Sequence, residues 1–131
     1  REEIPFKQEE ITFQGHAIEY RINAENPSKN FMPSAGKITN FITPGGFGVR
    51  MDTACYSGYT IPPYYDSMIA KLIVHSESRE EAVDISKRAL GEFIIDGIDT
   101  TIPFHMNLLK NDDFINNNYN TNFLALNDIM L

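Results

Sequence analysis

Two charged side chains lie where a β-strand has no need of charge. Arg21 opens the run RINAE (residues 21–25), and Asp66 lies in the run PPYYDS (residues 62–67). A guanidinium stays charged, offers its N–H donors in a rigid fork and can stabilise an oxyanion as it develops. A carboxylate across the sheet could orient that guanidinium and keep it aimed at a ligand. These residue types predict a binding or catalytic site built around Arg21 and Asp66.

Both residues also have ordinary structural explanations. Arg21 could be a surface arginine paired with Glu19 or Glu25, an arrangement that contributes only about 0–1 kcal/mol. Asp66 could cap or end a turn, because two prolines stiffen the backbone shortly before it. The residues by themselves leave these alternatives open.

Alternation of apolar and polar residues places Arg21 on a half-buried strand. Along residues 11–23, Ile18, Tyr20 and Ile22 share one face, and Arg21 lies on the opposite one. A turn at residues 26–30, rich in asparagine and containing a proline, ends this strand. Further strands are expected, the first two of them as an antiparallel hairpin, at residues 37–43, 47–52, 59–61 and 68–75.

Helices are expected mainly in the C-terminal half. Ser78 and Glu81 have the spacing of a capping box, in which each side chain bonds the other residue's amide. The core-facing stripe of the helix that follows is Ala82, Ile85, Ala89 and Phe93. A connector over residues 94–100 leads to a second helix near Pro103, and a short last helix begins near Asn122. The predicted class is α+β, with a mostly antiparallel, partly barrel-like sheet.

Composition excludes several classes of protein. With 131 residues the chain is predicted to be one domain, and its net charge of −7 argues against nucleic-acid binding. No apolar stretch approaches the length of a membrane span. The single cysteine, Cys55, indicates a reducing compartment and hence the cytoplasm. The charged start without methionine suggests a piece of a longer chain.

The glycines, histidines and cysteine of this sequence do not form a recognisable phosphate, metal or nucleophile site. The run GGFG (residues 45–48) lacks the phosphate-loop consensus, so a tight turn explains its glycines better. His16, His75 and His105 lie far apart without ligand-spaced partners, so no metal site is predicted. Cys55 has no histidine placed to activate it and is expected to be a small half-buried residue.

The two tyrosines before Asp66 are expected to be structural. Tyr64 and Tyr65 are predicted to pack, with hydrogen-bonded hydroxyls, rather than to donate protons.

The runs RINAE, GGFGVR (residues 45–50) and PPYYDS occur in an order and at distances that resemble the C-terminal domain of biotin carboxylase. The resemblance extends from about residue 7 to about residue 126, and its wording is closest to the bacterial acetyl-CoA carboxylase type. It implies that Arg21 contacts bicarbonate and the ureido group of biotin. It also matches Phe123 to a segment near the nucleotide base, although a core phenylalanine on a capped helix explains that residue equally well.

The same resemblance implies partners. Phe47 and Arg50 match a motif at the homodimer interface of bacterial biotin carboxylases, and an exposed phenylalanine beside an arginine has interface-like composition. The alternative is a packing residue of the sheet next to a solvated charge. The rest of a biotin carboxylase chain, a biotin carboxyl carrier protein and a carboxyltransferase are further implied partners.

In this family the phosphate-binding lysines, magnesium carboxylates and general base belong to an upstream ATP-grasp part, which residues 1–131 lack. The resemblance therefore implies a domain that forms one wall of a site using ATP, magnesium, bicarbonate and carrier-bound biotin, and that is inactive alone. The parent would serve malonyl-CoA and fatty acid synthesis.

Two other interpretations remain. Pyruvate, propionyl-CoA and urea carboxylases share this domain, so the acyl acceptor stays open. A non-catalytic, β-rich dimerisation module would depend on Phe47 and Arg50 and not on Arg21.

Overall fold

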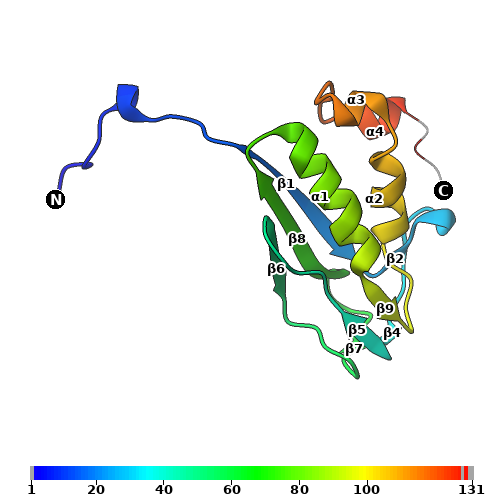
Figure 1. The fold of residues 1–131 in the computed structure, drawn as a ribbon. Coiled ribbons are helices and arrows are strands. Elements are labelled where there is room, and N and C mark those ends of the chain that lie inside the picture. The colour runs from blue at the N-terminus through cyan, green and yellow to red at the C-terminus, as the bar shows by residue number, and fades with distance from the viewer. Residues whose placement is uncertain (1, 128, 130–131) are drawn as a thin grey trace.

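A three-stranded antiparallel sheet forms the centre of the computed structural model, which describes residues 2–127 and residue 129 (Figure 1). Its strands, in spatial order, are β1 (His16–Asn23), β8 (Met68–Ser76) and β6 (Val49–Thr53). Lys71 on the central strand pairs with Arg21 on one side and with Asp52 on the other. Cross-strand partners point to the same face of a sheet, so these three side chains share a face.

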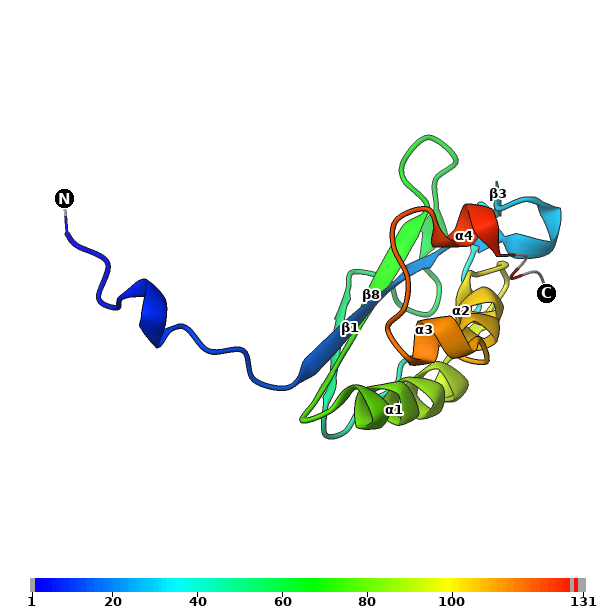
Figure 2. The same ribbon diagram turned by 90° about the horizontal axis from the view of Figure 1, so that it is seen from above.

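One face of this sheet is buried under a helix. α1 (Arg79–Glu92) runs across β1 and β8 in both ribbon views (Figures 1 and 2). Period-two alternation in the strands and helical spacing in α1 bring their apolar side chains together. Fully burying one such side chain stabilises the fold by roughly 1.5–3 kcal/mol. The buried residues at this contact include Ile18, Tyr20, Ile22, Leu72, Val74, Ala82, Ala89 and Leu90.

Only half of the predicted capping box forms. The Ser78 hydroxyl accepts the amide of Glu81 at 3.2 Å, as expected of an N-cap. The Glu81 carboxylate does not return to the amide of Ser78, because it accepts the hydroxyl of Ser76 at 2.6 Å. The start of α1 is thereby tied to the last residue of β8.

Three two-stranded antiparallel sheets surround the central one. They pair β2 (Glu25–Asn26) with β3 (Met32–Pro33), β4 (Gly36–Lys37) with β7 (Thr60–Ile61), and β5 (Asn40–Ile42) with β9 (Ile94–Asp96). The antiparallel prediction is confirmed. Within the described residues these sheets do not close on one another, so the barrel-like part of the prediction is not confirmed.

The predicted hairpin between residues 37–43 and 47–52 is wrong. β5 pairs with β9 and β6 pairs with β8, so the glycine-rich turn carries the chain from one sheet to another. Gly48, at φ +73°, has its carbonyl bonded to the amide of His75 at 2.9 Å, and an added Cβ would lie 2.6 Å from the His75 oxygen. The glycine is needed for this close approach to β8.

The first strand is shorter than predicted. It begins at His16, and the preceding residues leave the body of the molecule as an arm with one short 3-10 helix, η1 (Gln8–Glu10) (Figure 2). The predicted turn after β1 contains a second, η2 (Pro27–Lys29). The predicted connector 94–100 begins with β9.

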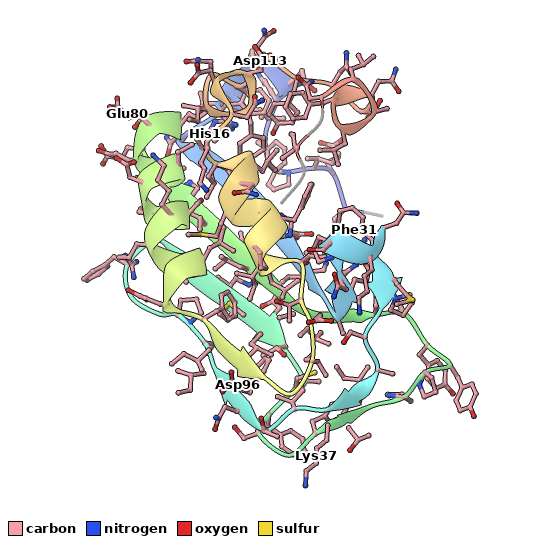
Figure 3. All side chains as sticks on the ribbon, turned by 90° about the vertical axis from the view of Figure 1, so that its right-hand side faces the viewer. His16, Phe31, Lys37, Glu80, Asp96 and Asp113 are labelled. Atoms are coloured by element: carbon pink, nitrogen blue, oxygen red, sulfur yellow. The ribbon has the colours of Figure 1, made fainter. Side chains whose placement is uncertain are left out.

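Two C-terminal helices lie where the sequence places them, α2 (Ile102–Leu108) and α4 (Phe123–Leu126). A further short helix between them, α3 (Asp112–Ile115), was not predicted. Arg79 at the start of α1 holds α3 in place (Figure 3 shows the helices with their side chains). Its guanidinium donates to the carbonyls of Phe114 and Ile115 and lies 5.1 Å from the centre of the Phe114 ring. Of the helices described, none combines the length and apolar character that crossing a membrane requires.

Candidate functional site

Arg21 projects from β1 on the face opposite α1. Ile22 and Tyr20, its neighbours in the chain, turn inward and are buried, so alternation turns Arg21 outward. Its side chain is 56% exposed. The guanidinium is therefore available to a ligand, while the backbone that carries it is paired with β8.

A charged face surrounds Arg21. We use this name for the outward side chains Glu19, Arg21, Arg50, Asp52 and Lys71, with Asp66 from the loop before β8. Three cations and three carboxylates balance there, although the whole chain carries a net charge of −7. Cations are thus concentrated locally, as an anion site in an acidic protein requires.

Two ion pairs occupy part of this face. Arg50 binds Asp52 through two hydrogen bonds of 2.9 and 2.8 Å, and this contact holds the pKa of the Asp52 carboxyl below its usual value. The ammonium of Lys71 lies 3.8 Å from the carboxylate of Glu19, beyond hydrogen-bond distance. Among the described residues, Arg21 likewise has a single carboxylate partner at ion-pair distance.

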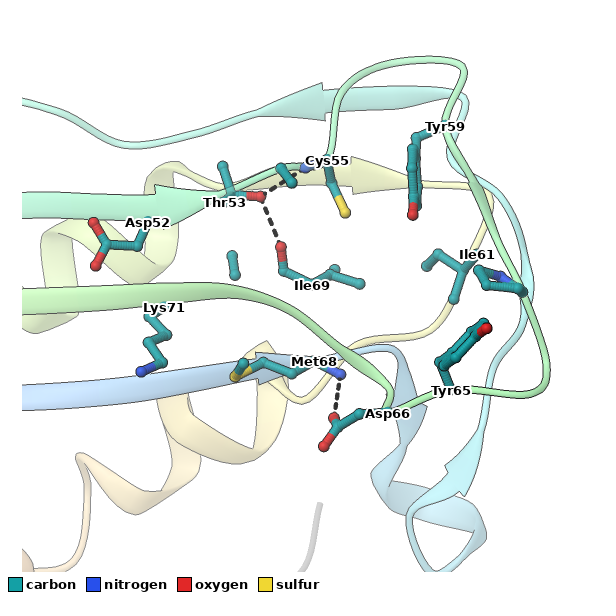
Figure 4. Close-up of a pocket in the computed structure, with 13 residues that line it drawn as sticks. Asp52, Thr53, Cys55, Tyr59, Ile61, Tyr65, Asp66, Met68, Ile69 and Lys71 are labelled. Atoms are coloured by element: carbon teal, nitrogen blue, oxygen red, sulfur yellow. Dashed lines mark hydrogen bonds between the residues drawn. The ribbon is translucent and has the colours of Figure 1, made fainter.

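That partner is Asp66. Nη2 of Arg21 lies 3.9 Å from Oδ2 of Asp66, within ion-pair range and beyond hydrogen-bond distance. The other carboxylate oxygen, Oδ1, accepts the backbone amide of Met68 at 2.8 Å (Figure 4). One oxygen therefore secures the turn, while the other lies within ion-pair range of Arg21. That Asp66 orients Arg21 stays a prediction.

A pocket of about 520 Å³ adjoins the charged face. Tyr59, Ile61 and Ile69 form its apolar side, and Asp66 and Lys71 lie at its charged edge (Figure 4). The structure therefore combines an apolar cavity with ionised groups next to the candidate arginine.

Cys55 lines the same pocket and is half-buried, as predicted. Burial raises the pKa of its thiol, which disfavours the reactive thiolate.

The prediction that both tyrosines before Asp66 pack is wrong. Tyr64 is 87% exposed and Tyr65 is 81% exposed. Most of each ring is therefore left uncovered, although Tyr65 borders the pocket.

The residues of the predicted dimer interface are also exposed. Phe47 is 100% exposed in the turn before β6, so it does not serve as a packing residue of the sheet. Arg50 lies on the charged face, 73% exposed. An interface through these residues stays a prediction.

Phe123 lies apart from the charged face, in the C-terminal helical region. Its ring is 7% exposed and lies 5.6 Å from that of Tyr119, and Asn122 makes no side-chain cap. Core packing accounts for the ring, and a contact with a nucleotide stays a prediction.

The histidines have structural contacts. Nε2 of His16 lies 2.7 Å from the Arg79 guanidinium, and Nε2 of His105 lies 3.0 Å from the carbonyl oxygen of Arg21. Across residues 2–127 and 129, no three histidine, cysteine, aspartate or glutamate side chains gather in a group that could hold a metal ion.

Sequence reasoning missed two residues beside Arg21. Thr101 and His105 both bond the Arg21 carbonyl, from a segment about 80 positions away in the chain. No motif or periodicity marks them. Lys71 did carry a signal, because a lysine inside an apolar strand must reach solvent or a partner.

The fold and the site define a class: an α+β domain whose antiparallel sheet presents an exposed arginine. Residues 19–126 match the family model described as the biotin carboxylase C-terminal domain. The chain therefore belongs to the biotin carboxylase C-terminal domain family.

Relatives extend over nearly the whole chain. It is 59% identical over 128 residues to biotin carboxylase 1 of Bacillus subtilis, covering 98% of this chain and 28% of that protein. It is 53% identical over 123 residues to a pyruvate carboxylase component of Methanothermobacter thermautotrophicus, covering 94% and 25%. The chain thus spans about a quarter of the length of these curated relatives.

A solved structure gives the same match in three dimensions. The biotin carboxylase domain dimer of the Hydrogenobacter thermophilus 2-oxoglutarate carboxylase, in complex with MgADP, ADP and bicarbonate, superimposes with a TM-score of 0.89 at 47% identity. The match covers 95% of this chain and 28% of that one.

Proposed function

We propose that this chain is the C-terminal domain of an ATP-dependent biotin carboxylase, in which Arg21 binds bicarbonate and the ureido group of biotin. The observation that carries the proposal is the placement of Arg21, whose side chain is 56% exposed on a backbone built into the sheet. Its position in the RINAE run of a family member supports the same role.

The donors present fit this ligand chemistry. Carrier-bound biotin supplies the ureido nitrogen that takes up the carboxyl group. The Arg21 guanidinium has its nearest carboxylate at 3.9 Å, so its N–H donors remain available to an anionic oxygen. Asp66 acts as a positioning residue, because its charge attracts the guanidinium while its bond to the Met68 amide fixes the carboxylate.

The residues of this chain do not fit ATP phosphates or magnesium. The sequence contains no phosphate-loop consensus, and the described residues form no metal-binding group of three. From the family resemblance we place the nucleotide and its metal on an ATP-grasp part outside residues 1–131, and we take residues 1–131 as one domain. Phe123 could approach the nucleotide base only once that part is docked.

We further propose the acetyl-CoA carboxylase type, in the cytoplasm, with a biotin carboxyl carrier protein and a carboxyltransferase as partners. The wording of residues 22–24 within the RINAE run supports this type. Pyruvate, propionyl-CoA or urea carboxylase is the alternative. The exposure of Phe47 and Arg50 supports a homodimer. The similar domain of the Hydrogenobacter thermophilus 2-oxoglutarate carboxylase is described as a dimer, which supports the same proposal.

The test replaces Arg21 by alanine in the intact parent enzyme and measures carboxylation of free biotin. Deleting one donor that acts in the transition state lowers turnover by roughly 10²- to 10³-fold. Arg21→Lys should recover only part of this, because an ammonium lacks the fork geometry. Arg88→Ala, which removes another exposed, ion-paired arginine, is the matched control.

Near-normal turnover of Arg21→Ala would remove Arg21 from the site and favour the dimerisation module. A separate arm assays the isolated chain, which should cleave no ATP in the presence of biotin and bicarbonate.

A further inference from the structure

The outer edge of β1 is closed by the start of α2 at the position of Arg21. β1 is an edge strand, because the order of the central sheet is β1-β8-β6. Edge strands leave a row of backbone groups without ladder partners. Here Thr101 supplies partners: its amide donates to the Asn23 carbonyl at 3.0 Å, and its hydroxyl accepts the Asn23 amide at 3.0 Å.

The Thr101 hydroxyl completes this contact by donating to the Arg21 carbonyl at 3.2 Å. Thr101 is the N-cap residue of α2, where a threonine hydroxyl ordinarily accepts an amide of the helix's first turn. It makes no such bond here. Thr101 is 5% exposed, and its hydroxyl bonds the backbone of β1 instead of an amide of α2.

One helical turn later, His105 reaches the same carbonyl. Its Nε2 lies 3.0 Å from the Arg21 oxygen, and because a carbonyl only accepts, Nε2 carries the proton. The ring meets that of Tyr20 edge to face at 5.4 Å, which holds its orientation. Burial lowers the pKa of His105, so the ring stays a neutral donor.

On the other side of the strand, the pairing of β1 with β8 is irregular near this point. Its register shifts between Ile22 and Asn23, two positions after the in-register pair of Arg21 with Lys71. The bonds from α2 occupy residues 21–23, the segment that includes this irregularity. The strand segment 21–23 is therefore held by its pairing with β8 on one edge and by the bonds from α2 on the other.

We propose that Thr101 and His105 are positioning residues for Arg21, which fix its backbone so that the guanidinium is presented in one direction. The proposal rests on the function proposed for Arg21. Reacting groups must be held within about 0.5 Å of the productive geometry, and a misplacement of about 1 Å can cost roughly 100-fold in rate.

The test compares Thr101→Val with Thr101→Ser in the parent enzyme, with free biotin as substrate. Valine has the shape of threonine without its hydroxyl, whereas serine keeps the hydroxyl. We expect Thr101→Val to lower kcat about 10- to 100-fold with little change in KM for biotin, and Thr101→Ser to stay near the parent value. Ile38→Val, which removes a buried methylene elsewhere in the core, controls for lost stability and should leave kcat unchanged.

A double-mutant cycle with Arg21→Ala separates positioning from general damage. If Thr101 acts through Arg21, Thr101→Val has no further effect once the Arg21 side chain is gone. Independent losses that multiply would overturn the proposal, as would a Thr101→Val enzyme with the parent kcat. If Arg21→Ala itself retains turnover, the proposed function fails instead.

His105 gives a second route if Thr101→Val does not fold. His105→Phe removes the donor but keeps a ring against Tyr20, and His105→Gln keeps an N–H donor. We expect the phenylalanine variant to lose kcat and the glutamine variant to recover part of it. Equal kcat in both variants would contradict the positioning role.

Discussion

The Asp66 carboxylate makes two different contacts, with one oxygen 2.8 Å from the Met68 amide and the other 3.9 Å from the Arg21 guanidinium. The first contact fixes the turn that leads into β8. The second leaves the guanidinium close to a negative charge but without a hydrogen bond to it. This asymmetry predicts that the two duties can be separated by mutation.

Asp66→Asn should separate them, because the amide oxygen can still accept from Met68 while the charge beside Arg21 is lost. We expect the free energy of unfolding to change by less than about 1 kcal/mol, since both partners are largely exposed. Turnover of the parent enzyme should fall. Asp66→Ala should lose stability as well, and unchanged turnover in Asp66→Asn would limit Asp66 to the turn.

Arg50→Glu should weaken the predicted homodimer. Reversing this charge places a second carboxylate beside Asp52, its present bidentate partner, and leaves like charges at the interface. Light scattering of the parent enzyme at low concentration measures the effect. Lys87→Glu reverses an exposed charge on α1 as the control, and an equal dimer constant in both variants would place the interface elsewhere.

Arg79→Ala should lower stability markedly. The guanidinium bonds the Phe114 and Ile115 carbonyls and stacks on the Phe114 ring, so its loss removes a charged donor from both carbonyls, although the Phe114 carbonyl keeps the Asn117 amide. Hydrogen bonds to charged groups contribute roughly 1.5–3 kcal/mol, so a loss of about 2 kcal/mol is expected in urea unfolding. Arg88→Ala breaks exposed contacts only, with the Glu92 carboxylate and, at 3.2 Å, with the Gly45 carbonyl, and should cost about 1 kcal/mol or less.

The buried His105 predicts a loss of stability in mild acid. Its folded-state pKa lies below the ordinary value of about 6.5, so between these two values the unfolded chain binds a proton that the folded chain does not. Stability should therefore fall as the pH drops from about 7 through 6.5, and this contribution should level off below the folded-state pKa. Urea unfolding from about pH 5 to 8 checks it: His105→Gln should flatten the slope, and an unchanged slope would assign the acid sensitivity to other groups.

The sequence by itself determined the strands that carry the site. Alternation set the inward and outward faces of β1, so the exposure of Arg21 and the burial of Ile22 followed from a period of two. The apolar run of β8 and the Ser78 cap of α1 were equally local signals. Local backbone geometry decides such features, and they can be read without knowing the neighbours.

The three-dimensional structure alone decided which segments meet. The pairing of β5 with β9, about 55 residues later, replaced the expected hairpin, because contacts across the chain and not the turn residues chose the partner. The exposure of Tyr64 depended on a loop that projects from the sheet. Thr101 and His105 reached Arg21 only because α2 packs against the edge of β1, and hydrogen bonds between segments so far apart leave no periodic trace in a sequence.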